Sequence, residues 1–393
     1  MTGPNPRPGA TLRDHNRARL LAAVDGAHGS TRAELGARTG LARSTVTDLV
    51  ADLLATGRLV EAGAGAASTG RVGRPSHRLR LAPRRALTVG IDLGHSHLRT
   101  GLVDSEGRVT AVREVALDVD SSPADALAAA RAMGADLLGG AGADRGLVEG
   151  AVIGLPAPVD VDRGTVGPGN VLPQWVERRP AVELQDVLGL PVLVENDANL
   201  GVLGEMAFGA AVGCTDVVYV KAATGIGAGI VLGGRLHRGV SGRAGEIGHV
   251  PVDLTGAVCR CGNRGCLETV AATTQVLGVL QPAHDTALTM ADVARLCDAA
   301  DPGASRVVRD AGRTIGRVLA DMVNSLNPGA VVLGGELAAA GAPLLAGLEE
   351  SLERFAQPGI LRDVTVRLGA LGVDAQLVGA GALALGLGAS TGS

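Results

Sequence analysis

The chain has 393 residues, of which 46% are hydrophobic and 19% are charged, so it is long enough for two or three domains that each bury a core. Only 1% of the residues are aromatic, which argues against recognition of single-stranded nucleic acid by base stacking. The Pro-, Gly- and Arg-rich N-terminus lacks the apolar segment of a signal peptide, and no apolar run approaches membrane-spanning length. We therefore expect a cytoplasmic protein without a membrane partner.

The net charge of -4 is unevenly distributed along the chain. Residues 1–85 contain 14 Arg and six acidic residues, a net of +8, whereas the remaining residues have a net of -12. A basic segment joined to an acidic body indicates an anion-binding module. DNA is the anion that we expect residues 1–85 to bind.

The segment 12–55 is expected to form three helices. The first should span residues 12–27, and the second should run over 31–39 with Ser30 as its cap and turn at Gly40 into the third. A short helix, a glycine turn and a longer helix are typical of a helix-turn-helix. Side chains at the start of the third helix would reach base edges: Arg43, Ser44, Thr45 and Thr47.

Residues 57–83 predict a strand, a loop rich in Gly, Ala and Ser, and a second strand, which together have the form of a wing. Three of its arginines are placed to contact phosphates or a minor groove: Arg71, Arg74 and Arg78. We therefore expect a mainly α winged helix-turn-helix domain over residues 1–85, with this loop as wing and linker. The alternative is a three-helix domain whose Arg-rich face serves oligomerisation.

From residue 86 onward, buried strands and helices alternate in two halves, which indicates an α/β fold with a cleft between the halves. We expect strands after Leu87, within 150–158 and 191–197, and one strand over 216–234. A long amphipathic helix should end before Pro328.

Three of the five cysteines lie together in the run CRCGNRGC, ten residues after His249. Thiolates and a neutral imidazole are ligands that suit Zn²⁺, and the glycines between them allow a tight turn. Four protein ligands would close the coordination shell, which predicts a structural zinc site: His249, Cys259, Cys261 and Cys266. The alternative is a loop of reduced cysteines beside a hydrogen-bonded core histidine.

The same stretch resembles a family signature. GEIGH at residues 245–249 followed by CxCGxxGCLE at 259–268 is similar to the signature of the ROK family, which includes bacterial sugar kinases and sugar-responsive repressors. The resemblance extends from about residue 87 to the C-terminus, and the preceding stretch, with GRPS at 73–76, resembles the DNA-binding end of the family's repressors. It implies an actin-like, ribonuclease-H-like ATPase fold in two halves, 86–205 completed by a helix over 374–390, and 206–373 with the zinc loop.

The resemblance also implies roles for single residues. Asp197 matches the family's catalytic base, the carboxylate that takes a proton from a sugar hydroxyl. By its position alone, Asp197 could instead cap the helix that begins near Ala198. Four further residues match those that hold sugar hydroxyls: Asn196, Glu246, His249 and Glu268. His249 would serve metal and sugar through different ring nitrogens. The loop over 167–175 could add contacts from Asn170 and Trp175.

The phosphate loops depart from the family's kinase pattern. Where a kinase resembles DxGGTK, this chain has His95 and His97, which add a side chain where backbone should approach phosphate and replace a lysine. The second loop, at 223–229, lacks the first glycine of the usual GTG, although Gly334 and Gly335 match the adenosine-side turn. We therefore do not expect ATP binding or turnover.

Together these features predict a sugar-responsive transcriptional regulator, a repressor of carbohydrate uptake or catabolism genes. It would bind a sugar or sugar-phosphate effector in the cleft and double-stranded operator DNA as a homodimer or homotetramer. One alternative is an ATP-dependent sugar kinase that carries a DNA-binding head, with Asp197 as its base. Another is a regulator with an inactive sugar site that a protein partner controls.

Overall fold

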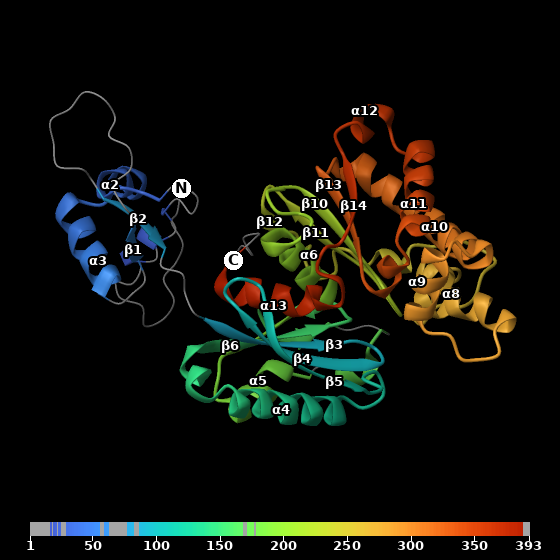
Figure 1. Ribbon diagram of the computed structural model, residues 1–393, viewed down its shortest axis with the longest axis horizontal. Helices are drawn as coiled ribbons and strands as arrows, with labels where there is room; N and C mark the ends of the chain where they lie inside the picture. Colours follow the sequence, from blue (N-terminus) through green and yellow to red (C-terminus); the bar gives the residue numbers. More distant parts are fainter. Residues whose placement is uncertain are drawn as a thin grey trace. The chain divides into compact units, whose positions relative to one another are not determined.

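The computed structural model describes residues 16–17, 19–21, 23–24, 29–55, 59–62, 77–81, 86–167, 171–176 and 178–387 (Figure 1). The chain divides into two compact units, residues 1–85 and 86–393. Most of the helix expected over 12–27 lies outside the described residues, as do Arg71, Arg74 and Asn170. None of the described helices is long and apolar enough to cross a membrane.

The N-terminal unit contains a helix pair. Helix α2 (Arg32–Thr39) ends at Gly40, whose φ of +68° lies in the left-handed region, and helix α3 (Arg43–Ala55) begins just beyond it. Glycine adopts this conformation without the strain of a Cβ, so the chain can change direction there. Strands β1 (Leu59–Ala62) and β2 (Arg78–Leu81) form an antiparallel pair. A buried apolar cluster joins helices and strands: Leu35, Val46, Leu49, Val50, Leu53, Leu59 and Leu79.

The cap of α2 differs from the expected one by one residue. Thr31, not Ser30, is the cap, because its hydroxyl accepts the Glu34 backbone N–H while the Glu34 carboxylate accepts the Thr31 N–H. Ser30 is buried and pairs with Leu79 in a β-bridge. A contact with a distant strand therefore excludes Ser30 from the capping position.

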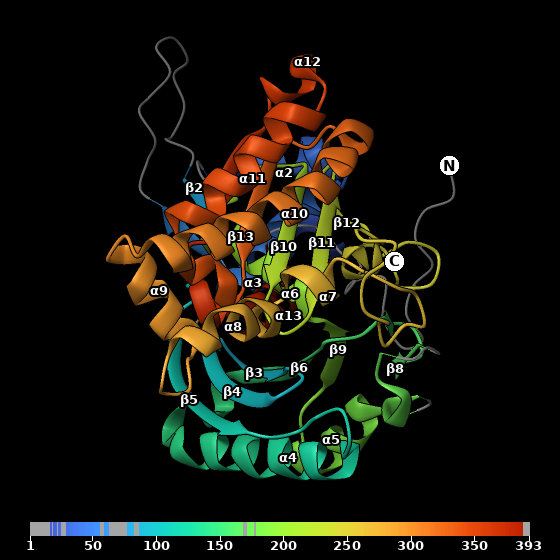
Figure 2. The same cartoon turned by 90° about the vertical axis from the view of Figure 1, so that its right-hand side faces the viewer.

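The first half of the body is a five-stranded mixed sheet in the order β5-β4-β3-β6-β9. Strands β3, β4 and β5 are antiparallel neighbours, whereas β6 and β9 run parallel to β3. Helices α4 (Pro123–Gly140) and α5 (Pro180–Leu188) cover its outer face (Figure 2). The strands are β3 (Leu87–Leu93), β4 (His97–Asp104), β5 (Val109–Ala116), β6 (Val148–Leu155) and β9 (Val192–Asn196). The short pair β7 (Val159–Asp160) and β8 (Thr165–Val166) follows β6.

The second half is also a five-stranded mixed sheet, in the order β12-β11-β10-β13-β14. The single strand expected over 216–234 is a hairpin, because the chain reverses between β10 and β11. The turn falls at residues 223–225, at the start of the glycine-containing loop identified over 223–229, so that loop was the sequence signal for the reversal. The strands are β10 (Val217–Ala222), β11 (Ile226–Leu232), β12 (Arg235–Leu236), β13 (Ala330–Gly334) and β14 (Thr365–Leu368).

Two long helices, α10 (Pro302–Leu326) and α11 (Ala342–Phe355), pack closely in the second half. A Cβ on Gly347 would lie 2.0 Å from the Arg309 carbonyl oxygen, so only glycine permits this approach. As predicted, α10 is amphipathic and ends before Pro328. Four shorter helices complete this half: α7 (Glu268–Ala271), α8 (Thr273–Leu280), α9 (Met290–Asp298) and α12 (Pro358–Leu361).

Helices α6 (Asp197–Phe208) and α13 (Ala375–Leu385) pack on one another between the two sheets (Figure 1). Their backbones nearly touch, since a Cβ on Gly379 would lie 1.8 Å from the Leu200 carbonyl oxygen. Helix α6 follows β9 of the first sheet and also contacts β10 and β11 of the second. Its first turn therefore lies where the two halves meet.

Candidate functional site

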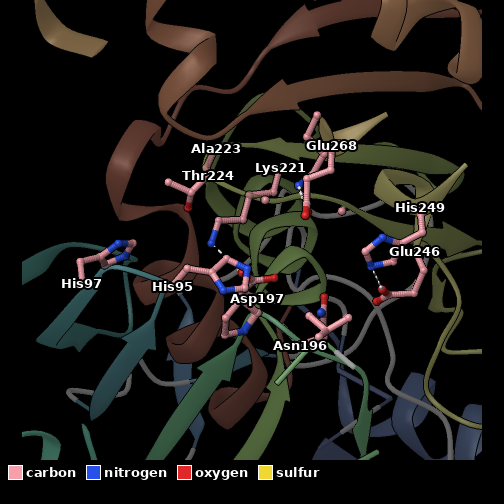
Figure 3. Close-up of a pocket in the computed structure, with 16 residues that line it drawn as sticks. His95, His97, Asn196, Asp197, Lys221, Ala223, Thr224, Glu246, His249 and Glu268 are labelled. Atoms are coloured by element: carbon pink, nitrogen blue, oxygen red, sulfur yellow. Dashed lines mark hydrogen bonds and ion pairs between the residues drawn. The ribbon is translucent and has the colours of Figure 1, made fainter. Parts of the chain in front are cut away.

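A pocket lies between the two halves, beside the first turn of α6 (Figure 3). The first half contributes the turn between β3 and β4, and α6 contributes its N-terminal residues. The second half contributes the end of β10, the turn after it, and the segment around the cysteine loop. All five residues that were expected to hold a sugar line this pocket: Asn196, Asp197, Glu246, His249 and Glu268.

Asp197 is the first residue of α6, and its two carboxylate oxygens have different partners. Oδ1 accepts the backbone N–H of Ala198 at 2.7 Å, and Oδ2 lies 2.6 Å from the Lys221 Nζ. The N-cap is Asn196, whose side-chain oxygen accepts the backbone N–H of Asn199 at 3.1 Å. The alternative that Asp197 is the cap is therefore wrong by one residue, and the Asp197 carboxylate lines the pocket.

Lys221 is the only lysine in the chain, and the sequence analysis did not give it a role in the site. It lies on β10 opposite Gly227 of β11 and Gly334 of β13. Its side chain is 10% exposed and that of Asp197 is 9% exposed. Burial by itself would lower the pKa of Lys221, but the nearby carboxylates of Asp197 and Asp92 raise it above its usual value. The ammonium therefore stays charged.

His97 covers the turn that would approach a phosphate in a kinase. A Cβ on Gly94 would lie 2.1 Å from a carbon of the His97 ring, so the imidazole lies directly against this backbone. Its Nε2 lies 3.4 Å from Oδ2 of Asp92. Burial alone would raise the pKa of Asp92, but Lys221 and His97 hold it below the usual value.

His95 lies over the second glycine turn. Its Nε2 would be 3.2 Å from a Cβ on Gly225, and a Glu268 carboxylate oxygen would be equally close. The other ring nitrogen, Nδ1, lies 2.7 Å from Asp120, which also accepts from Arg260 at 2.9 Å. Both histidines that distinguish this chain from the kinase pattern therefore occupy space beside the glycine turns.

Glu246 and His249 line the pocket next to the cysteine loop, and Glu268 lines it beside the second glycine turn. The Nε2 of His249 lies 3.6 Å from Oε2 of Glu246, which agrees with the expectation that one turn presents both side chains. A Glu268 oxygen accepts the backbone N–H of Ile226 at 3.3 Å. Burial, together with the charges of Asp197 and Glu268, raises the pKa of Glu246 to about 7. Carboxylates and an imidazole grouped in this way suit the hydroxyls of a sugar.

The predicted metal ligands converge: the ligand atoms of His249, Cys259, Cys261 and Cys266 all lie within 4.8 Å of one another. The Sγ atoms of Cys261 and Cys266 are 3.7 Å apart, and the Cys259 Sγ is 3.6 Å from the His249 Nδ1. Ligands at about 2.3 Å from a tetrahedral metal would be separated by about 3.8 Å. Burial and the other two thiols raise the pKa of Cys266 to about 12, so a cation is needed to hold it as thiolate. The residues therefore could hold one metal ion.

His249 connects this cluster with the pocket. Its Nδ1 faces the thiols while its Nε2 faces Glu246, so metal binding would fix the orientation of the ring and leave Nε2 available to a ligand. Trp175 does not contribute to the pocket. Its side chain is fully buried in the first half, where Nε1 donates to the Val119 carbonyl at 2.8 Å. The expectation of a sugar contact from Trp175 is therefore wrong.

The expected DNA contacts at the start of α3 are largely at the surface. Arg43, Ser44 and Thr47 are exposed and Thr45 is half-buried. The hydroxyl of Thr47 donates to the Arg43 carbonyl at 2.9 Å. Arg78 lies on β2, and its guanidinium is 3.5 Å from a carboxylate oxygen of Glu34.

Comparisons with known proteins agree with this geometry. The model of the ROK family matches residues 88–386. The xylose repressor of Bacillus subtilis is 33% identical over 303 residues, which is 77% of this chain and 77% of the repressor. A solved ROK family transcriptional regulator, a homologue of the Escherichia coli MLC protein, has a TM-score of 0.77 and 25% identity, and the match covers 95% of this chain and 96% of the regulator.

A ROK family glucokinase from Streptomyces griseus, solved with glucose and AMPPNP, has a TM-score of 0.68 and 32% identity. The match covers 77% of this chain and 100% of the kinase. The body therefore has the actin-like fold of sugar kinases with its mixed sheets, as the resemblance implied. Relatives of this chain include both repressors and kinases.

Proposed function

Because the chain belongs to the ROK family, we propose that it is a DNA-binding transcriptional regulator that responds to a sugar and does not phosphorylate it. The observation that carries the proposal is the ion pair between Asp197 and Lys221, at 2.6 Å. A general base must accept a proton from the reacting hydroxyl. Here the carboxylate would first have to leave a buried ammonium, so the residue that matches the catalytic base is held in another interaction.

The phosphate loops support the same proposal. Phosphoryl transfer depends on backbone N–H groups and cations that surround the phosphates. The His97 ring lies against Gly94, and the His95 ring lies beside Gly225, so imidazoles stand where the two loops would have to approach a nucleotide. Zinc is proposed as the metal of the cysteine cluster, in a structural role, and ATP is not a cofactor in this proposal.

The N-terminal unit is proposed to be a winged helix-turn-helix that binds double-stranded operator DNA. Its support is the net charge of +8 over residues 1–85 and the exposed polar residues at the start of α3. The solved regulator matches 95% of this chain, whereas the glucokinase matches 77%. Because paired half-sites require a two-fold arrangement, the active form is proposed to be a homodimer or homotetramer.

The effector is proposed to bind in the pocket through Asn196, Asp197, Glu246, His249 and Glu268. A sugar can control DNA binding only if it binds one state of the protein more tightly than the other. The relatives suggest a regulator of carbohydrate uptake or catabolism genes, and repression is the mode that we propose.

The test is a fluorescence anisotropy titration of the full chain with DNA from beside its own gene, at moderate salt. We expect specific binding that one sugar from a panel of aldoses weakens at least about tenfold, which corresponds to a coupling of about 1.4 kcal/mol. Absence of specific binding with or without sugars would contradict the proposal.

A sugar kinase that carries a DNA-binding head is the second candidate, since Asp197 lines the pocket and Gly334 and Gly335 match the adenosine-side turn. A coupled ADP-release assay over the same panel separates the two candidates. Turnover that Asp197→Ala abolishes would establish the kinase.

A further inference from the structure

Basic side chains around the pocket lie beside carboxylates. Lys221 is paired with Asp197 at 2.6 Å, and the His97 ring nitrogen lies 3.4 Å from Asp92. Both carboxylates are buried, so water screens their charges only weakly. At this end of the pocket, one ammonium therefore faces two buried carboxylates.

Two further pocket residues, His95 and Glu268, also lie beside charged side chains. Asp120 accepts from Arg260 at 2.9 Å and lies 2.7 Å from the His95 ring. Arg260 also lies 3.6 Å from Glu268. One guanidinium therefore lies beside two carboxylates, one from each half of the body.

Lys221 lines two hollows of the body. It lines the pocket that holds the proposed sugar contacts, and it also lines a second hollow with Asp92, Ser96, Gly335 and Glu336. A phosphate attached to the hydroxyl nearest Asp197 would therefore have to enter beside the Lys221 ammonium. That ammonium already faces Asp197 and Asp92, and the glycine turns that could supply N–H groups lie beside imidazole rings.

From this arrangement we propose that the pocket selects an uncharged sugar and rejects the same sugar carrying a terminal phosphate, and that the Lys221–Asp197 pair sets this selectivity. The inference rests on the proposed sugar-binding function of the pocket and names the chemical class of the effector. A phosphate dianion would meet two buried carboxylates and the Lys221 ammonium. The Arg99 guanidinium also lines the second hollow, but Glu114 and Asp374 already pair with it, so repulsion exceeds attraction. A neutral sugar brings no charge and can exchange hydrogen bonds with the same groups.

The first measurement is calorimetry of the wild-type chain with glucose, N-acetylglucosamine and xylose. Glucose and N-acetylglucosamine are compared with their 6-phosphates, which keep the same pyranose ring, whereas xylose is titrated only as the free sugar because its 5-phosphate cannot form that ring. The sugar that binds should do so at least about tenfold more tightly than its 6-phosphate, the preference expected of about 1.4 kcal/mol of repulsion. An ester that binds the wild-type chain more tightly than its parent sugar would overturn the inference.

The second measurement reverses the charge balance. Asp197→Asn keeps the shape of the side chain and removes one carboxylate, so Lys221 regains attraction for an anion. The ratio of ester to sugar affinity should rise at least about tenfold relative to wild type. Asp136→Asn is the matched control, because Asp136 is an exposed residue of α4 paired with Arg113 away from the pocket. An unchanged ratio in Asp197→Asn would show that the pair does not set selectivity.

Inorganic phosphate provides a measurement that does not depend on which sugar binds. Millimolar phosphate, at constant ionic strength, should raise the melting temperature of Asp197→Asn but not that of wild type or Asp136→Asn. Phosphate stabilisation of the wild type would overturn the inference while leaving the proposed regulator intact. Failure of every sugar and ester to affect DNA binding would instead contradict the proposed function.

Discussion

Near the cysteine loop, Glu246 and His249 line the pocket 3.6 Å from one another, and Glu268 lines it beside Gly225. At the other end, His95 and His97 lie beside the glycine turns, and Lys221 holds Asp197. The two ends belong to one fold shared with kinases. Under the proposed function, the first end binds the sugar, while the second end lacks the phosphate contacts that phosphoryl transfer needs.

The largest effect on sugar affinity should come from the metal cluster, because its residue His249 also lines the pocket. Cys261→Ser would remove one of four ligands and release the His249 ring, so we expect loss of bound zinc and a loss of sugar affinity of up to about 100-fold, by analogy with the effect of altered metal surroundings on activity. Metal analysis and calorimetry measure the two effects. Cys214→Ser is the control, because this half-buried cysteine lies outside the cluster. Full sugar binding by zinc-free Cys261→Ser would contradict the supporting role.

The next effect is on folding stability and concerns the ion pair between Lys221 and Asp197. Lys221→Met would leave the buried Asp197 carboxylate without its partner, which should lower the free energy of unfolding by about 3–5 kcal/mol. Adding Asp197→Asn to the same chain removes the unpaired charge and should restore most of the loss. Urea denaturation of wild type, both single variants and the double variant forms the cycle that measures the coupling. Additive losses would show that the two side chains do not stabilise one another.

A smaller effect is expected from Glu268→Gln, which removes the charge of a proposed sugar contact and keeps the shape of its side chain. Loss of a charged hydrogen-bond acceptor should weaken sugar binding by about 1.5–3 kcal/mol. Operator affinity without sugar should stay at the wild-type value, because the substitution lies in the body. Anisotropy titrations with and without sugar measure both quantities, and equal sugar affinity in the variant would remove Glu268 from the site.

The smallest effect should follow His97→Gly, which uncovers Gly94. AMPPNP affinity should rise by no more than about tenfold, because His95 still lies over Gly225 and Lys221 still holds Asp197. ADP release should stay at background for the same reason. Calorimetry and the coupled assay test this, and sugar-dependent turnover in this single variant would show that the second end has retained its catalytic parts.

Much of the site could be predicted because its groups are close in sequence. The metal ligands Cys259, Cys261 and Cys266 lie on one short loop, and its glycines permit the turn, so local spacing already indicated convergence. Glu246 and His249 were predicted to share a turn for the same reason. The amphipathic helix α10 followed from its apolar period.

Other features could not be predicted from the sequence because they depend on contacts between residues that are far apart in the chain. The β-bridge of Ser30, the residue before the cap of α2, involves a strand far along the chain. The positions of His95 and His97 over Gly225 and Gly94 depend on how the turns fold.

By itself, the sequence determined the family, and it predicted the four residues that could hold a metal ion and the five pocket residues proposed to hold a sugar, because these residues lie in short motifs. Only the tertiary structure decided that the sole lysine pairs with Asp197, because that contact joins a strand of one half to the helix between the halves. Charge compensation depends on distance through space and on burial, and neither can be read from separation along the chain.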